Sequence, residues 1–320
     1  SGIDTLQGDL IDAVILTGGF GNGFTGSENS IANGFNAVDV FIGNGGTLTG
    51  QNAVSTWDLD GTPTVTVGAN SASFSGFATL QGGTDADTFN VTAASAFVLR
   101  GGNGNDDFNV SATVENINAE GGTDTIDILS ALSFGAAQTL DYTAETITLD
   151  AGVTTQGGTV DLNGNVVLGN SVTIDTTNAG GSAGGADVTV TGTINDTVAE
   201  SNSLTINAGT GGDVDLQGAV GGAQPIAGLT ITNANNLDLE DVTVEANTSI
   251  TQTAGTGLTS IDGALTTSGS GTVSLATDGS IQSSGGGDIS TAGGAVTLNS
   301  DRDATGGGSI HVGSGSTINS

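Results

Sequence analysis

Three glycine-rich loops that contain aspartate recur about every 20 residues in this chain, and this spacing restricts its fold more than any other feature. The loops read GGTDADTFNV from Gly82, GGNGNDDFNV from Gly101 and GGTDTIDIL from Gly121, so the intervals between their starts are nearly equal. A recurrence of this length, with turn residues at fixed offsets, is typical of a solenoid whose coils stack on one another. The sequence therefore predicts that each loop lies above the one before it.

The first two loops align residue by residue and predict the register of the stack. We expect five pairs of residues, each pair at the same interval, to face each other: Leu80 and Leu99, Asp87 and Asp106, Phe89 and Phe108, Asn90 and Asn109, Val91 and Val110. In this register the two phenylalanine rings stack inside the core, which favours folding beyond the area that they bury.

The loops also match a calcium-binding nonapeptide, G-G-x-G-x-D-x-U-x, in which glycines permit the turn and aspartate supplies a hard oxygen ligand. The second loop fits at every defined position, and the first has Asp85 in place of the third glycine. The third loop has Ile126 at the aspartate position, with Asp127 one place later. These loops resemble the β-roll of repeats-in-toxin proteins, and the resemblance implies Ca²⁺ between the loops of adjacent coils. One loop per coil, where that family has two, implies a single ion edge.

The predicted calcium ligands combine the acids of the loops, the carbonyl groups of two glycines, one asparagine and one acid near the start of the chain. Ser1-Gly2-Ile3-Asp4-Thr5-Leu6 reads as part of the same repeat, and we expect its acid to complete an ion site. The alternative is that Gly-Gly-x-Asp forms only a tight turn. The candidate residues are Asp85, Asp87, Asp106, Asp107, Asp124, Asp127, Gly82, Gly101, Asn103 and Asp4.

The charge of the chain favours cations as partners. Its net charge of -32 arises from 34 acids against Arg100 and Arg302. Such a chain offers no grip on nucleic-acid phosphates and no attraction to an anionic membrane surface. It also has no apolar run long enough to span a bilayer. Because calcium sites of millimolar affinity occur in extracellular modules, we expect an extracellular, cell-surface or matrix location.

The pattern after Ile147 predicts many short strands and no helix. Val, Ile and Leu alternate with Thr, Asp and Ser in runs such as TVDL, VTID and LTIN, which glycine, asparagine and serine separate. All ten phenylalanines lie between Phe20 and Phe134. We therefore predict an all-β, right-handed parallel β-helix (β-solenoid) of roughly 20 residues per coil. Its expected parts are an irregular aromatic segment (1–80), calcium-loop coils (81–130) and a narrow aliphatic segment (131–320), which together form one continuous rod.

Longer phrases of the C-terminal half carry a second resemblance. Residues 157–181, 203–222, 225–239 and 293–310 resemble the β-strand repeats of giant bacterial surface proteins related to filamentous haemagglutinin. Proteins of that family are secreted, form long β-helical rods and serve in adhesion or surface coating. The resemblance implies a structural surface fibre or adhesin stalk. The main alternative is an adhesin domain whose lateral face binds a glycan or a receptor on a host or neighbouring cell.

Enzymatic function is the least favoured alternative, although parallel β-helices include polysaccharide-degrading enzymes. Acid pairs for glycoside cleavage are present at Asp106 and Asp107, and in the set Asp238, Glu240 and Asp241. His311 is the only histidine, so the sequence indicates neither a Ser-His-Asp triad nor a metal site of several histidines. No aromatic residue follows Tyr142 to stack on a sugar. We therefore expect no catalysis.

The expected partner of the chain is another solenoid coil. The sequence starts within a repeat and stops within a strand phrase, and no polar cap is evident at either end. We expect either further coils of a longer parent chain or head-to-tail association with a second copy, which would produce a fibre.

Overall fold

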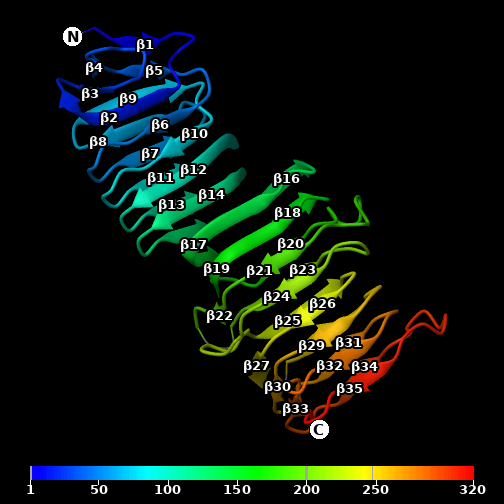
Figure 1. The fold of residues 1–320 in the computed structure, drawn as a ribbon. Coiled ribbons are helices and arrows are strands. Elements are labelled where there is room, and N and C mark those ends of the chain that lie inside the picture. The colour runs from blue at the N-terminus through cyan, green and yellow to red at the C-terminus, as the bar shows by residue number, and fades with distance from the viewer. Residues whose placement is uncertain (1, 199–200, 247) are drawn as a thin grey trace. The chain divides into compact units, whose positions relative to one another are not determined.

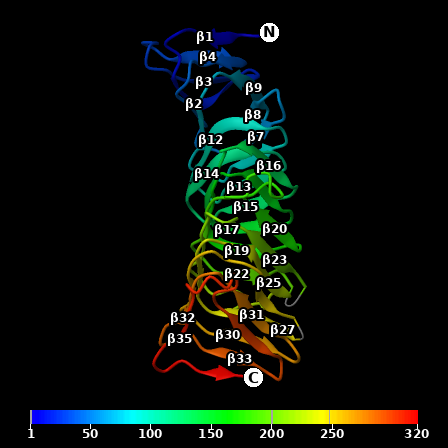
Figure 2. The same cartoon turned by 90° about the vertical axis from the view of Figure 1, so that its right-hand side faces the viewer.

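The chain folds entirely into strands and turns. The structure is a computed structural model that describes residues 2–198, 201–246 and 248–320. Over these residues it contains strands from β1 (Thr5–Gln7) to β36 (Ile318–Asn319) and no helix, as Figures 1 and 2 show. The predicted all-β class is confirmed. It follows that the described part of the chain has no helix with the length and apolar character needed to cross a membrane.

The chain divides into two compact units. The first comprises Ser1–Ser130 and Tyr142–Thr146, and the second comprises Ala131–Asp141 and Ile147–Ser320. The strand β17 (Leu140–Leu149) contributes residues to both units. Each unit is described below by itself.

Two parallel ladders form the frame of the first unit. In each ladder, inward residues are apolar and alternate with polar residues, as expected for strands with one buried face. The first ladder joins β2 (Ala13–Phe20), β6 (Thr47–Thr49), β10 (Thr79–Gln81), β12 (Ser95–Asn103) and β14 (Val114–Gly121). The second joins β7 (Thr56–Leu59), β11 (Thr88–Val91), β13 (Asp107–Val110) and β15 (Thr125–Ile128).

The predicted register of the first two loops is confirmed. Leu80 pairs with Leu99, and Phe89 pairs with Phe108, so both ladders advance by the same interval at this step. The next step of the second ladder is one position shorter, because Phe108 pairs with Ile126. At each step, paired residues are separated by the same number of positions in both ladders. Each loop between β10 and β15 therefore stacks on the preceding loop.

Antiparallel insertions interrupt the N-terminal part of this unit. The strands β3 (Gly23–Ser27) and β4 (Phe35–Val38) extend β2 in an antiparallel meander, and β8 (Thr64–Val67) and β9 (Asn70–Ser75) extend β7 in the same way. β9 also pairs in parallel with β5 (Val40–Ile42), which pairs in parallel with β1. Because the second insertion lies between β7 and β11, Trp57 is much further along the chain from its partner Phe89 than Phe89 is from Phe108. This explains why residues 7–79 show no regular recurrence.

The second unit contains three parallel ladders. One joins β16 (Leu132–Ala136), β18 (Val153–Gln156), β20 (Val172–Asp175), β23 (Ser203–Asn207), β25 (Gly228–Asn233), β28 (Ile250–Gln252), β31 (Val273–Ala276) and β34 (Val296–Asn299). Another joins β19 (Val160–Leu168), β21 (Val188–Val190), β24 (Val214–Leu216), β26 (Leu237–Leu239), β29 (Thr259–Ile261), β32 (Ile281–Ser283) and β35 (Ile310–Val312).

The third ladder starts where β22 (Ile194–Asp196) pairs with the end of β19, and it continues through isolated bridges at Val220. It then joins β27 (Val242–Ala246), β30 (Leu265–Ser268), β33 (Ile289–Thr291) and β36. The interval between paired residues varies more in this unit than in the loop segment, and the step from Val172 to Leu204 is the longest among the strand pairs described for this unit. The inward residues are mostly Val, Leu and Ile, as expected for a narrow aliphatic core.

Candidate metal centre

Three aspartates occupy the same position, directly before three successive strands of one ladder in the first unit. Asp87, Asp106 and Asp124 each immediately precede a strand of the second ladder, namely β11, β13 and β15. Their side chains are 1%, 0% and 0% exposed. We refer to these residues as the aspartate column. Three buried carboxyl groups in register are unusual, because a buried charge is costly unless it is paired.

The register corrects the prediction for the third loop. Ile126 does not take the aspartate position, because it pairs with Phe108 in the core and Asp124 takes that position instead. The glycine pair is displaced as well, since Gly121 pairs with Asn103. The physical reason is that a shift of two positions leaves the inward and outward faces unchanged, so alternation alone does not distinguish the two registers.

A directional chain of hydrogen bonds links the column. Asp106 Oδ1 accepts the N–H of Asp87 at 2.8 Å, and Asp124 Oδ1 accepts the N–H of Asp106 at 2.8 Å. At one end, the N–H and hydroxyl of Ser55 donate to Asp87 Oδ1. At the other end, Glu145 Oε2 accepts the N–H of Asp124 at 2.9 Å. Each carboxylate therefore satisfies a backbone donor where a strand begins.

The second oxygens of the column differ in their surroundings. Asp87 Oδ2 accepts the N–H of Gly83 at 2.6 Å. In contrast, Asp106 Oδ2 and Asp124 Oδ2 are buried and have no hydrogen-bond donor. Two adjacent loops thus each present one buried carboxylate oxygen without a donor.

The first glycine of each of the first two loops is required by close packing. A Cβ on Gly101 would lie 2.4 Å from Asp106 Oδ2 and 2.4 Å from the carbonyl oxygen of Ala119. A Cβ on Gly82 would similarly lie 2.5 Å from Asp87 Oδ2. The glycines therefore allow the aspartates to fold back over their own loops.

Burial disfavours the charged form of the column. Burial, together with the charges of the Asp87, Asp124 and Asp107 carboxylates, raises the pKa of Asp106 to about 7, although the hydrogen bond from the Asp87 N–H lowers it. Burial also raises the pKa of Asp87 and of Asp124. A carboxyl group in this setting is either protonated or neutralised by a cation. Carboxylate oxygens are the donors that Ca²⁺ prefers, so the donor type fits the predicted ion.

The other predicted ligands are not drawn into the column. Asp85, Asn103 and Asp107 are exposed, and Asp107 Oδ1 accepts the hydroxyl of Thr125 at 2.6 Å. Asp127 is half-buried and pairs with Asn109 on the neighbouring strand.

Asp4 lies at a different place in the first unit. It is exposed before β1, where its N–H donates to Asp39 Oδ2 at 2.9 Å, and β1 pairs with β5. Ser1, which opens the predicted N-terminal motif, lies outside the described residues.

Two residues that hydrogen-bond to the column, Ser55 and Glu145, were missed in the sequence. Ser55 precedes Asp87 by a long interval, and the β8–β9 insertion hides this relationship. Glu145 belongs to a segment without a Gly-Gly signature. Over the ranges that the structure describes, no group of three or more His, Cys, Asp or Glu side chains is arranged so that these side chains alone could bind a metal ion. Any ion at the column therefore also needs carbonyl or water ligands.

The acids considered for glycoside cleavage in the second unit do not form a comparable set. Asp238 is half-buried. Burial, the hydrogen bond with Asp262 and the charges of Asp262 and Asp215 together raise its pKa to about 6. Glu240 and Asp241 are exposed. Asp238 is therefore paired with Asp262 and not with Glu240 or Asp241.

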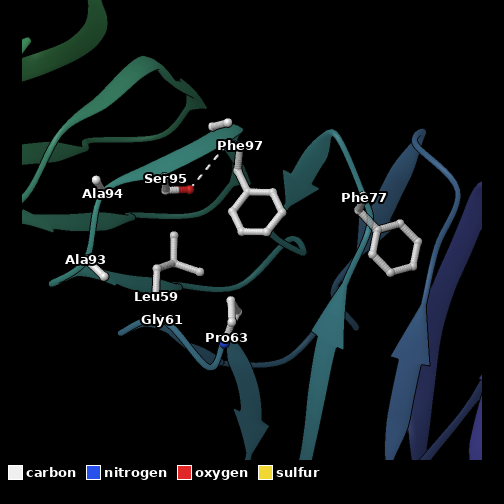
Figure 3. Close-up of a pocket in the computed structure, with 9 residues that line it drawn as sticks. Leu59, Gly61, Pro63, Phe77, Ala93, Ala94, Ser95 and Phe97 are labelled. Atoms are coloured by element: carbon white, nitrogen blue, oxygen red, sulfur yellow. Dashed lines mark hydrogen bonds between the residues drawn. The ribbon is translucent and has the colours of Figure 1, made fainter. Parts of the chain in front are cut away.

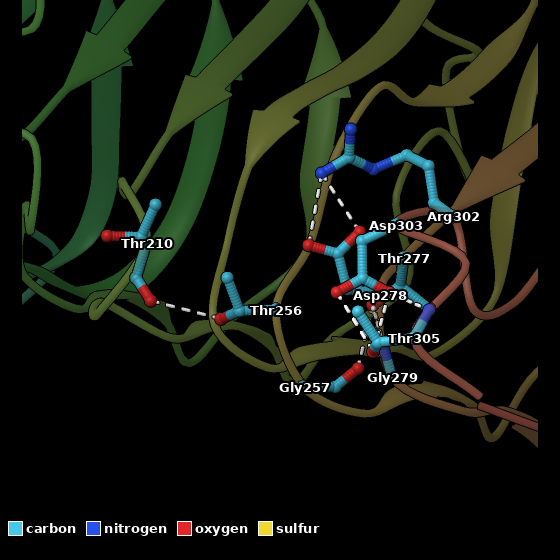
Figure 4. Close-up of polar contacts among 9 residues, drawn as sticks. All are labelled: Thr210, Thr256, Gly257, Thr277, Asp278, Gly279, Arg302, Asp303 and Thr305. Atoms are coloured by element: carbon cyan, nitrogen blue, oxygen red, sulfur yellow. Dashed lines mark hydrogen bonds and ion pairs between the residues drawn. The ribbon is translucent and has the colours of Figure 1, made fainter. Parts of the chain in front are cut away.

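The second arginine contributes to a turn of the second unit. Arg302 forms an ion pair with Asp278, whose two carboxylate oxygens lie 3.0 Å and 3.1 Å from the guanidinium (Figure 4). Asp303 accepts the N–H and hydroxyl of Thr305 within the same turn. These contacts are those of an exposed surface turn and have a small effect on stability.

The fold and the column define an all-β protein of stacked parallel ladders with a buried acidic column. No protein-family model matches the chain, and no curated protein or solved structure matches it significantly. The resemblances to repeats-in-toxin loops and to filamentous-haemagglutinin-like proteins therefore stay predictions.

Proposed function

We propose that the chain is a non-catalytic structural protein whose parallel ladders are faces of a right-handed β-solenoid stabilised by Ca²⁺. One observation carries the proposal: Asp106 Oδ2 and Asp124 Oδ2 are buried in adjacent loops without a donor. Ionised carboxylates in such positions destabilise a fold unless a cation or proton neutralises them. A bound Ca²⁺ removes this cost and joins neighbouring coils.

The geometry favours a position for the ion one loop further along than the motif alone suggests. Both oxygens of Asp87 already have donors, whereas one oxygen on each of Asp106 and Asp124 is buried without a hydrogen-bond donor. We therefore place the ion between the second and third loops, with Asp106 and Asp124 as its carboxylate ligands. When bound, Ca²⁺ supplies positive charge and additional coordination positions, which carbonyl groups or water fill.

The proposed setting is an extracellular surface or matrix, where a rod of stacked coils serves as a fibre or adhesin stalk. The short and nearly equal steps from Phe89 to Phe108 and on to Ile126 support compact coils of regular length in the loop segment. The longer steps of the second unit support coils of similar build with larger turns. Calcium at millimolar concentration outside cells would keep such loops loaded.

The proposed partner is a further coil, from this polypeptide or from another copy. Ile310 and Val312 on β35 and Ile318 on β36 are 47%, 44% and 46% exposed, although Ile281 and Ile289, the strand neighbours of Ile310 and Ile318, are buried. A further coil would cover these side chains and pair with the free edges of both strands. Light scattering across a range of protein concentrations tests association with another copy, because such association should increase the mean molecular mass with concentration. A constant monomer mass at high concentration contradicts it.

Thermal unfolding with and without Ca²⁺ tests the proposed function. We expect calorimetry to detect Ca²⁺ binding and the melting temperature to rise with Ca²⁺ concentration, as ligand linkage requires. Asp106→Asn keeps the Oδ1 acceptor but removes the charge, so it should abolish the calcium response. Asp161→Asn is the matched control, because Asp161 is half-buried on β19 in the second unit. An unchanged melting curve in Ca²⁺ and in chelator, with no calorimetric signal, would show that the column only caps backbone donors.

A further inference from the structure

The first unit also contains an apolar pocket beside β12. Its volume is about 250 Å³, and its walls include Leu59, Pro63, Phe77 and Phe97. Figure 3 shows the Phe97 ring between Ser95 and Phe77, with Leu59 and Pro63 on the same side of the pocket. The run from Ala93 to Ala96 adds only small side chains, which leave the pocket accessible.

A β-bulge directs Phe97 into this pocket. Ser95 pairs with Val114 and Val98 pairs with Asn116, so Ala96 and Phe97 together oppose a single residue of β14. A bulge inserts one residue, bends the strand and re-aims a side chain, and bulges are common beside binding sites. Phe97 is consequently half-buried, whereas Leu99 two positions later is fully buried in the core.

Three backbone N–H groups around the pocket already have partners. The N–H of Ala93 donates to the carbonyl of Leu59, and the N–H of Ser95 donates to the carbonyl of Thr113. The N–H of Phe97 donates to the Ser95 hydroxyl at 3.2 Å. These three N–H groups are therefore not available to a polar ligand.

Charge is also absent from the pocket lining, although the chain carries a net charge of -32. Asp60, next to Gly61 on the rim, has its Oδ1 occupied by the N–H and hydroxyl of Thr62. Anionic ligands are repelled by the chain as a whole, and cations find stronger partners at its many acids. The pocket therefore favours an uncharged, apolar ligand over an anion or a cation.

We propose that this pocket binds the uncharged aromatic ring of a small molecule. An apolar cavity of about 150 Å³ is already sufficient for benzene, so the available volume accommodates one ring with a short substituent. Phe77 and Phe97 provide aromatic walls, and Phe97 is held by Phe74, whose ring centroid is 5.9 Å away. Offset or edge-on contacts with these rings favour an aromatic ligand over an aliphatic one of equal size.

Fluorine NMR of ring-fluorinated benzyl alcohol tests this proposal on the full chain. We expect saturable line broadening that unlabelled benzyl alcohol reverses and that cyclohexylmethanol reverses only at higher concentration. No saturable broadening would overturn the proposal. Equal competition by cyclohexylmethanol would overturn the assignment of an aromatic ligand.

Two substitutions locate the binding site. Ala94→Trp fills the pocket from its exposed rim and should abolish binding, whereas Ala292→Trp, at an exposed alanine of the second unit, should leave it unchanged. Phe97→Ala removes one aromatic wall and should weaken binding about two- to tenfold. Unaltered binding by Ala94→Trp and Phe97→Ala, in proteins with the circular dichroism of the parent, would place the ligand elsewhere and refute the site.

Discussion

The ring of Phe89 lies parallel to the ring of Phe108, with centroids 4.7 Å apart and an angle of 7° between the planes. Trp57 continues the stack on the other side of Phe89, at 5.4 Å and 8°. All three side chains are at most 1% exposed, and they come from β7, β11 and β13. The stack therefore couples the buried cores of three successive strands, directly beside the aspartate column.

Removing one ring of this stack should destabilise the protein strongly. We expect Phe108→Ala to lower the free energy of unfolding by about 3–5 kcal/mol, because it leaves a cavity and breaks the aromatic pair. Urea unfolding followed by the fluorescence of Trp57, the only tryptophan, measures the effect. Phe20→Ala is the control, since Phe20 is 62% exposed and its loss should cost less than about 0.5 kcal/mol. A loss below about 1 kcal/mol for Phe108→Ala would contradict the stacked core.

The calcium response should depend on Asp124 and not on Asp127. The register places Asp124 in the buried column, whereas Asp127 pairs with Asn109 on a half-buried face. We therefore expect Asp124→Asn to weaken Ca²⁺ binding at least about tenfold by titration calorimetry, because it removes one of two charged ligands. Asp127→Asn should bind as the parent does. If Asp127→Asn weakened Ca²⁺ binding and Asp124→Asn did not, the result would support the alternative register, in which Ile126 takes the aspartate position.

Without calcium, the first unit should become less stable as the pH rises from 5 to 8. The pKa of Asp106 is about 7 in the folded chain, above its ordinary value of 3.8, so the folded state holds a proton that the unfolded state releases. The stabilisation is complete below pH 4 and is lost as the pH rises through 7. Melting temperatures in chelator should show this decline.

Two comparisons isolate the contribution of the column to this pH dependence. Asp106→Asn should flatten the curve between pH 5 and 8, because the other acids of the chain titrate equally in both proteins. Saturating Ca²⁺ should also flatten or reverse it, since the ion competes with the proton. An identical slope in the parent and in Asp106→Asn would mean that repulsion among surface acids causes the whole effect.

Adding a methyl group to Gly101 should be far more harmful than adding one to Gly121. The new Cβ of Gly101→Ala meets the Ala119 carbonyl and the Asp106 carboxylate, both at 2.4 Å, so the loop must move. We expect a loss of about 1–3 kcal/mol by urea unfolding. The nearest atom to a Cβ on Gly121 is the flexible Asn103 side chain at 3.2 Å, so Gly121→Ala should change stability by less than about 0.5 kcal/mol. Equal effects would show that the close approach at Gly101 is absent.

Local patterns in the sequence were sufficient to predict the all-β class and the register of the first two loops. Residues with a period of two assign the buried face of each strand, and the loops at Gly82 and Gly101 align residue by residue, which predicted the observed pairing of Phe89 with Phe108. The same alignment placed Asp87 on Asp106. These inferences needed only local spacing.

The register of the third loop, the hydrogen-bond partners at the ends of the column and the pocket became apparent only from contacts between distant segments. A shift by two positions preserves alternation, so the pairing of Gly121 with Asn103 follows from ladder hydrogen bonds that no local pattern encodes. Ser55 reaches the column across an insertion, and Glu145 comes from a strand without a motif. The bulge at Phe97 is visible only against its neighbour β14. In each case the deciding contact joins residues whose separation along the chain varies, whereas sequence periodicity reports only constant separations.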